Sequence, residues 1–227
     1  MTRRSCQGFT LIELLISVSI LSLLLLVGSF SYSLLADNWQ DVTKKFDIAE
    51  NDSRAINYMI SVFSGIFPYV VYQNKIDKKA VLFFTGNEHR ILSVTHSGLV
   101  GEAKTELFRV EAITNANGKL DLMYYASELS QPIIYADQKV ELEQGMVLIK
   151  NMDSVSFQYL GWDSYQQKYQ EPEQYISPSW RNRFSGITNQ LLPETIEIKL
   201  SKQGKQTSIV IQLDKTSSRL LSSYYQD

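Results

Sequence analysis

One unbroken apolar run dominates the N-terminal part of the chain. No charged residue occurs from Leu14 to Ala36, and a helix of about 20 apolar residues is long enough to span a bilayer. Arg3 and Arg4 precede the run, so the positive-inside rule places the N-terminus in the cytoplasm. The pattern therefore predicts a single-pass membrane helix, with everything after Asp37 outside the cytoplasmic membrane.

Three ordinary explanations of this run stay open. A cleaved signal peptide has an apolar region of about 7–15 residues, which is shorter, although Ser31-Tyr32-Ser33 fits a small-x-small cleavage site. A plain signal anchor is the second, and a buried core helix is the least favoured because the run is apolar all round. None of the three accounts for Glu13, because a carboxylate in an apolar segment is costly in hydrocarbon unless it finds a partner.

Beyond the apolar run, the spacing of hydrophobic residues stays helical as far as Pro68, where we expect the helix to end. Charged residues lie between the apolar ones, so this second half is amphipathic. The predicted buried stripe consists of Trp39, Val42, Phe46, Ala49, Ile56, Ile60, Phe63 and Phe67. We expect both halves to form one rod over residues 10–66, about 85 Å long at 1.5 Å per residue.

After Pro68 the hydrophobic period becomes about two, which is typical of strands. The predicted strands are Tyr69–Tyr72, Ala80–Thr85, Ile91–Thr95, Phe108–Ile113, Leu120–Tyr125, Met146–Ile149, Val155–Leu160, Ile196–Leu200 and Ser208–Leu213. Asn117-Gly118 is the best hairpin turn, and residues 202–205 form a second candidate. No alternation of strands with helices suggests a parallel sheet. The sequence therefore predicts an α+β fold, with one long N-terminal helix packed on antiparallel sheet.

A polar segment, Gly161–Asn189, interrupts the strand pattern and contains Trp162 and Trp180. A long loop inside a compact domain is uncommon and often functional, and exposed aromatic residues suit a protein–protein contact. We therefore take Trp162 and Trp180, with Trp39 and Phe46 of the helix, as candidate partner contacts. The alternative, slightly favoured for each tryptophan taken singly, is that it pins the loop to the sheet.

Composition and charge exclude several classes of function. The 227 residues carry a formal net charge of −2, without a block of like charges, which disfavours nucleic-acid binding. One cysteine and two histidines provide few of the side chains that usually bind zinc. His89 and His96 are interpreted as surface residues. The usual nucleophile-elbow, P-loop and His-Glu-x-x-His motifs do not occur. We therefore expect no catalytic residue, metal or cofactor, and no enzyme activity.

The residues around the start of the apolar run match a known pattern. Gly8 followed by Phe9-Thr10-Leu11-Ile12-Glu13 resembles the processing and methylation motif of type IV pilins and type II secretion pseudopilins. The resemblance implies that a prepilin peptidase cuts between Gly8 and Phe9 and N-methylates Phe9. It implies a pilin-like fold with a leader at residues 1–8, a transmembrane and filament-core helix at 9–36, and a periplasmic domain at 37–227. In that domain, residues 37–67 would form the amphipathic helix and 68–227 the β-rich part.

The same resemblance gives Glu13 a partner. Cleavage after Gly8 would free a positively charged amine at Phe9, and in a filament this amine of one subunit can pair with Glu13 of its neighbour. A charge pair inside an apolar bundle contributes register more reliably than net stability. We therefore assign Glu13 to recruitment and filament register.

A second resemblance lies near the C-terminus and concerns the J-class minor pseudopilins (general secretion pathway protein J). It rests on Val155-x-Phe157-x-Tyr159, Trp162, Trp180, Leu192-Pro193 and Ile196-x-Ile198-x-Leu200. The gap between the two tryptophans is longer than is usual in that family. The resemblance implies a minor pseudopilin at the tip of the periplasmic pseudopilus, with I- and K-class minor pseudopilins and the major pseudopilin as partners.

Two other functions stay open. A minor pilin of a type IV or mannose-sensitive surface pilus would share Gly8, Phe9 and Glu13, and would act in pilus assembly or adhesion. Many type IV pilins close a C-terminal loop with a disulfide, whereas the only cysteine here, Cys6, lies in the leader, which favours a pseudopilin. A membrane-tethered module whose aromatic loop binds sugar or peptide is the other alternative.

Overall fold

The computed structural model describes residues 11–100, 105–129, 131–142, 144–169 and 176–213. Within α1 and β7, the side chains of residues 34, 36–38, 40–49 and 144 lie outside this description. The chain divides into two compact units, Met1–Asn51 and Asp52–Asp227. The division falls inside the predicted amphipathic helix.

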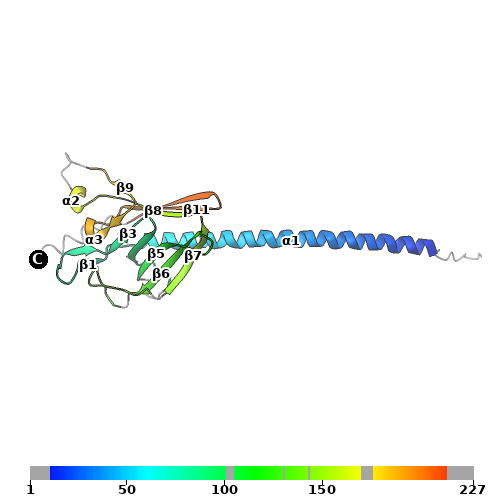
Figure 1. Cartoon of the computed structure of the whole chain (residues 1–227), viewed down its shortest axis with the longest axis horizontal. Helices are drawn as coiled ribbons and strands as arrows, with labels where there is room; N and C mark the ends of the chain where they lie inside the picture. The colour runs from blue at the N-terminus through cyan, green and yellow to red at the C-terminus, as the bar shows by residue number, and fades with distance from the viewer. Residues whose placement is uncertain (1–10, 101–104, 130, 143, 170–175, 214–227) are drawn as a thin grey trace, which may run out of the picture. The chain divides into compact units, whose positions relative to one another are not determined.

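One long helix precedes a series of strands (Figure 1). Helix α1 is continuous from Leu11 to Ser64. The strands are β1 (Val70–Tyr72), β2 (Ala80–Leu82), β3 (Phe84–Gly86), β4 (Arg90–Thr95), β5 (Glu106–Thr114), β6 (Leu120–Glu128), β7 (Gln144–Met152), β8 (Ser154–Gly161), β9 (Ser179–Arg181), β10 (Phe184–Ser185), β11 (Thr195–Lys202) and β12 (Lys205–Gln212). Two short helices, α2 (Tyr165–Lys168) and α3 (Gly186–Asn189), lie among the later strands.

The strands form three antiparallel sheets in the described part of the chain. A six-stranded sheet has the order β10-β3-β4-β5-β6-β7, a four-stranded sheet has the order β12-β11-β8-β9, and β1 pairs with β2. Every pair of named strands is antiparallel. The predicted α+β fold, a long N-terminal helix with antiparallel sheet, is confirmed.

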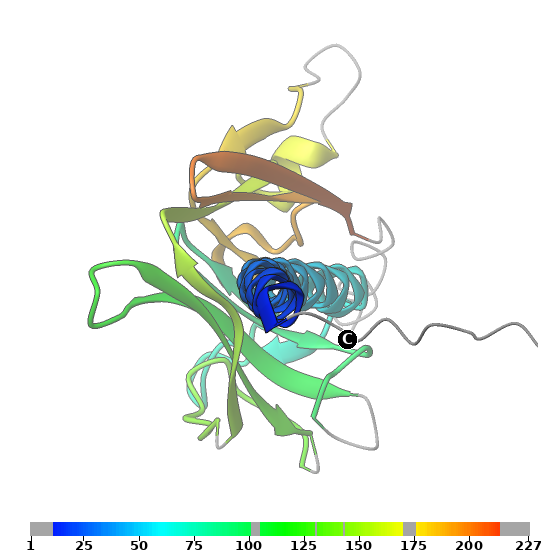
Figure 2. The same cartoon turned by 90° about the vertical axis from the view of Figure 1, so that its right-hand side faces the viewer.

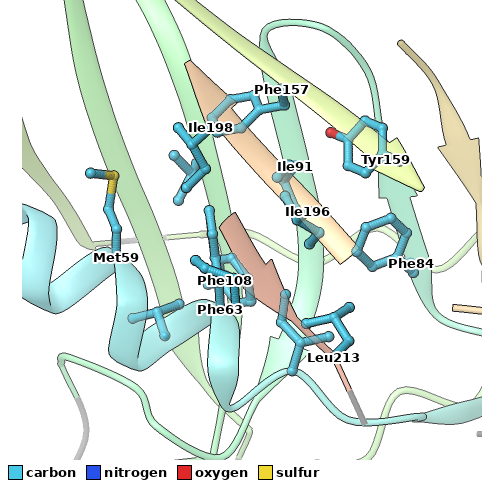
Figure 3. Close-up of a cluster of buried hydrophobic side chains, with 14 of the residues drawn as sticks. Met59, Phe63, Phe84, Ile91, Phe108, Phe157, Tyr159, Ile196, Ile198 and Leu213 are labelled. Atoms are coloured by element: carbon cyan, nitrogen blue, oxygen red, sulfur yellow. The ribbon is translucent and has the colours of Figure 1, made fainter. Parts of the chain in front are cut away.

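The two larger sheets enclose the last turns of α1 within residues 52–227 (Figure 2). Figure 3 shows Met59 and Phe63 of α1 among side chains of both sheets. The Phe63 ring lies 5.8 Å from the Phe108 ring of β5 and 6.3 Å from the Phe157 ring of β8, centroid to centroid. Burying several large side chains, each worth about 1.5–3 kcal/mol, makes this cluster the main core.

The buried face of α1 differs by one position from the predicted stripe. The buried residues of α1 are Ala55, Met59, Val62 and Phe63, of which Phe63 belongs to the predicted stripe. The predicted Ile60 is 39% exposed, and Ile56 is partly buried. Adjacent apolar residues at 55–56 and 59–60 fit the helical period equally well. The pattern alone therefore did not distinguish Ala55 from Ile56 or Met59 from Ile60.

Helix α1 ends at Ser64, four residues before Pro68, and Thr95 of β4 and the adjacent His96 donate hydrogen bonds to carbonyl groups at this end. The Thr95 hydroxyl donates to the carbonyl of Val62 (2.7 Å), and His96 N–H donates to Gly65 O (2.9 Å). A Cβ atom on Gly65 would lie 2.5 Å from the Thr95 hydroxyl oxygen, so only glycine allows this approach. The last carbonyls of a helix need such partners.

Two predicted elements are wrong in detail. The run Ala80–Thr85, predicted as one strand, is divided at Phe83 between β2 and β3, which belong to different sheets. The segment Gly161–Asn189, predicted as a loop, contains α2, β9, β10 and α3. These elements are two to four residues long, too short to show a hydrophobic period.

Both predicted hairpin turns are confirmed. Gly118 (φ 72°) closes the turn between β5 and β6, and Gln203 and Gly204 (φ 52° and 76°) form the two-residue turn between β11 and β12. Two successive positive φ angles match the twist of the strands that such a turn joins. Near this second turn, Lys202 Nζ contacts both carboxylate oxygens of Asp52 (2.8 and 2.6 Å), which joins the last hairpin to α1.

Asp153 connects the two hairpin turns. Its carboxylate accepts from Lys119 Nζ (2.5 Å) and from Gly204 N–H (3.2 Å). These bonds, the one from Lys119 first, hold the pKa of Asp153 below its ordinary value of 3.8. The charged form is therefore favoured in the folded chain, and its contribution to stability is present above about pH 4 and lost as pH falls further.

We predict that Asp153→Asn lowers the melting temperature slightly at pH 7, where the carboxylate is charged in both states. The difference from the wild type should shrink as pH falls below about 4, because the wild-type carboxyl group then takes up its proton and loses the charge. Thermal unfolding of the purified chain in mild detergent across pH 2.5–7 measures this. Asp137→Asn, at an exposed position, is the control. A difference that stayed constant with pH would contradict the prediction.

Candidate functional site

The candidate site for assembly is the first part of α1. The stretch Leu11–Ser33 is long and apolar enough to cross a membrane, and none of it is buried inside the protein. Its large hydrophobic side chains are each more than half exposed. A contiguous apolar surface of this size marks a membrane or interaction surface. This helix indicates a membrane anchor, in which lipid or neighbouring helices cover the apolar side chains.

Glu13 is the only charged residue of this stretch. It lies in the first turn of α1, and its backbone carbonyl accepts a hydrogen bond from the Ser17 hydroxyl (2.7 Å). An acidic residue near a helix N-terminus is favoured by the helix dipole. The structure thus places Glu13 on the exposed surface of an apolar helix, and its role in filament register stays a prediction.

The other residues predicted for processing and contact at this end are described only in part. Gly8 and Phe9, the predicted cleavage position, lie outside the described residues. Trp39 is 64% exposed and remains a candidate partner contact. The side chain of Phe46 lies outside the description, so its assignment stays untested.

Trp162 belongs to the core rather than to the surface, which corrects its assignment as a partner contact. Its side chain is 5% exposed. The indole N–H donates to the carbonyl of Ile176 (2.7 Å), and the Lys168 ammonium lies 4.6 Å from the ring centroid. Asn189 Nδ2 also donates to the Trp162 carbonyl (3.1 Å). Trp162 therefore pins the segment to the sheet, as the alternative interpretation held.

Trp180 has the opposite environment. It lies on the short edge strand β9, opposite Leu160 of β8, and is 47% exposed. Tyr169 and Ile176 of the same segment are also about half exposed. Large aromatic residues dominate the binding energy of protein interfaces. Trp180 therefore remains a candidate partner contact.

The two histidines have structural contacts and exposed side chains. The His96 ring stacks on Phe67 with 3.6 Å between centroids, and its Nδ1 lies 3.2 Å from the Thr105 hydroxyl. His89 Nδ1 lies 3.1 Å from the carbonyl oxygen of Val155. Their interpretation as surface residues is confirmed.

One buried carboxylate was not predicted from the sequence. Glu106 is fully buried, and its two oxygens accept from the N–H groups of Leu99 (3.0 Å) and Val100 (2.6 Å) and from the Tyr124 hydroxyl (2.8 Å). Burial, and then the bond to Glu106, raise the pKa of Tyr124 far above its ordinary value. Such a group fixes the loop at residues 98–100 to the sheet.

Comparison with known families decides the nature of the N-terminal segment. Residues 3–29 match the family model described as the prokaryotic N-terminal methylation motif. The chain has a prepilin-type N-terminus. A search of the curated proteins found no match to the chain.

The prepilin-type N-terminus makes the chain pilin-like over the segment that the motif covers. It implies cleavage by a prepilin peptidase, methylation of the new N-terminus and assembly with other pilin-like subunits. The matched residues contain Gly8, Phe9 and Glu13, and they overlap the exposed apolar part of α1. The motif and the structure therefore point to the same segment as the assembly site.

Proposed function

We propose that this protein is a minor pseudopilin of a type II secretion system. It would help to form the tip complex that initiates the periplasmic pseudopilus, together with I- and K-class minor pseudopilins, and the major pseudopilin would extend the filament below. Filament growth would promote export of folded proteins across the outer membrane. The role is structural and involves no catalysis or cofactor.

One observation supports this proposal above the others. A fully exposed apolar helix with a prepilin-type motif continues into a folded β-rich unit with its own core. Before assembly, the inner membrane covers the apolar helix, with the N-terminus cytoplasmic and the folded unit periplasmic. On assembly, helices of neighbouring subunits replace lipid around the same surface, which costs little because both environments are apolar.

Glu13 gives that exchange its direction. A carboxylate in hydrocarbon is unfavourable, whereas in a bundle the amine freed at Phe9 of a neighbour offers a charged partner. The Glu13 carboxylate is therefore more favourable in the helix bundle than in lipid, and only in the register that places it beside a neighbour's amine. Trp39 and Trp180, both well exposed, would provide contacts outside the membrane.

We predict that an in-frame deletion of the gene abolishes release of secreted proteins into the culture supernatant and leaves surface pili at wild-type number. Both quantities are measured in the same cultures, and the deletion is complemented with the wild-type gene as control. Loss of secretion is expected because filament growth needs its initiating tip.

The reverse result would identify the rival function. Lost pili with normal secretion would assign the chain to a type IV or mannose-sensitive surface pilus, as a minor pilin in assembly or adhesion. If neither quantity changed, a membrane-tethered binding module would replace both filament roles.

A further inference from the structure

Strand β1 pairs with β2 through one of its two edges. Phe83 N–H donates to Tyr69 O (2.8 Å), and Gln73 N–H donates to Lys79 O (2.9 Å). These two bonds fix the alternation of the antiparallel ladder, in which every second residue directs its backbone groups to the partner. Val71 is therefore the residue of β1 that bonds to β2.

Val70 and Tyr72 consequently direct their backbone groups to the opposite edge of β1. At Tyr72 this edge is occupied, because Tyr72 N–H donates to Ile134 O (2.8 Å) and Tyr72 O accepts from Ala136 N–H (2.8 Å). The contact is a parallel bridge between Tyr72 and Tyr135. A third chain segment thus joins the small sheet at one point.

The parallel ladder stops one step before it would reach Val70. Its continuation would use the carbonyl of Pro132 and the N–H of Ile134, but Ile134 N–H donates instead to the Gln138 side chain (3.3 Å). The intervening Ile133 N–H donates to the Tyr69 hydroxyl (3.2 Å). Within the described residues, the outward N–H and C=O of Val70 have no hydrogen-bond partner.

A pocket lies where the ladder is interrupted. Its volume is about 480 Å³, within the range of about 300–1,000 Å³ that ligand sites have. It is lined by Pro68, Tyr69, Val70, Val71, Tyr72, Pro132, Ile133 and Ile134. No lining residue is charged, and Tyr72 and Ile134 expose apolar side chains at 39% and 48%.

We propose that this pocket binds an extended, uncharged peptide segment of another protein. The segment would lie along β1 and exchange hydrogen bonds with the N–H and C=O of Val70, while apolar side chains enter the pocket. Addition of a strand to a free edge is a common mode of peptide recognition, in which backbone bonds give affinity and pockets give specificity.

The chemistry of the pocket selects this occupant. A donor and an acceptor on one residue match the backbone of an extended chain, whereas a lipid tail or other hydrocarbon would leave both unsatisfied. The absence of charge from the lining disfavours acidic or basic segments, because a charge would lose water there without gaining a partner. The inference does not depend on the secretion assignment.

The test is selection of a displayed library of random heptapeptides on the purified full chain in mild detergent. We expect the enriched peptides to be uncharged, and their affinity is then measured by fluorescence anisotropy. Val70→Pro removes the outward N–H and should weaken binding about fivefold or more. Ile134→Asp places a charge at the rim and should weaken it by at least as much.

Two matched variants control for general effects. Val210→Pro places a proline at a valine of another edge strand, β12. Leu213 N–H donates to Glu194 O, and the alternation of this ladder turns the N–H of Val210 away from β11. Ile76→Asp adds a charge at a side chain that is 97% exposed and outside the pocket lining. Both should bind the peptides as the wild type does.

Three results would overturn the proposal. They are no enrichment over a detergent-only selection, enrichment of charged peptides, and affinity that is unchanged in both Val70→Pro and Ile134→Asp. An equal loss of affinity in Val210→Pro would also count against the site. Circular dichroism shows whether each variant is folded, and if Val70→Pro is not, Ile134→Asp against Ile76→Asp decides the question.

Discussion

Replacing Glu13 by alanine will leave processing intact and prevent incorporation into the filament. The cleavage position, between Gly8 and Phe9, is four residues away from Glu13. The substitution therefore leaves the glycine that the peptidase recognises unchanged. The substituted helix has no carboxylate for the pairing that we propose with a neighbour's amine, and the bundle would lose the interaction that sets its register. Incorporation should fall to below about one tenth of the wild-type level.

The measurement is a comparison of processed chain in the membrane with chain in sheared filaments, by immunoblot. Glu13→Gln, which keeps the shape and removes the charge, should behave like Glu13→Ala. Both variants should keep the wild-type melting temperature, because Glu13 lies outside the unit formed by residues 52–227. Incorporation of either variant at the wild-type level would refute the role assigned to Glu13.

Replacing Glu106 by alanine will cause a large loss of stability. The carboxylate accepts from Leu99, Val100 and Tyr124 in a fully buried position. Its removal leaves buried donors without acceptors, at a cost of about 2–4 kcal/mol in the free energy of unfolding. For a chain of this size the melting temperature should fall by about 5–15 °C.

Two further substitutions separate the contributions at this site. Tyr124→Phe removes one donor and keeps both backbone bonds, so it should cost only about 1 kcal/mol. Glu106→Gln keeps the shape and part of the acceptor capacity, so it should fall between Tyr124→Phe and Glu106→Ala. Thermal unfolding of the purified chains in detergent measures all three. A Glu106→Ala chain that melts within 2 °C of the wild type would contradict the prediction.

Elements whose hydrophobic pattern extends over many residues could be predicted from the sequence, and very short elements could not. The predicted strand Ile196–Leu200 lies within β11, and it alternates apolar and polar residues over several positions. The predicted strand Leu120–Tyr125 likewise lies within β6. Strands β9 and β10 have three and two residues. Their place is set by pairing with β8 and β3, which is tertiary information.

The candidate site shows the same division between local and distant information. Glu13 stands out because it is a charge in an apolar run, and the prepilin-type motif is contiguous along the chain. Glu106 has no such signal, because it lies before the predicted strand Phe108–Ile113 and its partners include backbone N–H groups. Trp162 and Trp180 look alike in sequence, and only the surrounding contacts separate the buried one from the exposed one.

The ion pair between Asp52 and Lys202 joins residues 150 positions apart. This separation affects the order in which the protein folds as it is made. The core that Ala55, Met59 and Phe63 begin is completed by Ile196, Ile198 and Leu213. The chain between these two regions must be brought together before their contacts can stabilise it. The core around the end of α1 is therefore incomplete until the hairpin of β11 and β12 has formed. An apolar helix that enters the membrane during synthesis would therefore be anchored before the unit formed by residues 52–227 completes its core.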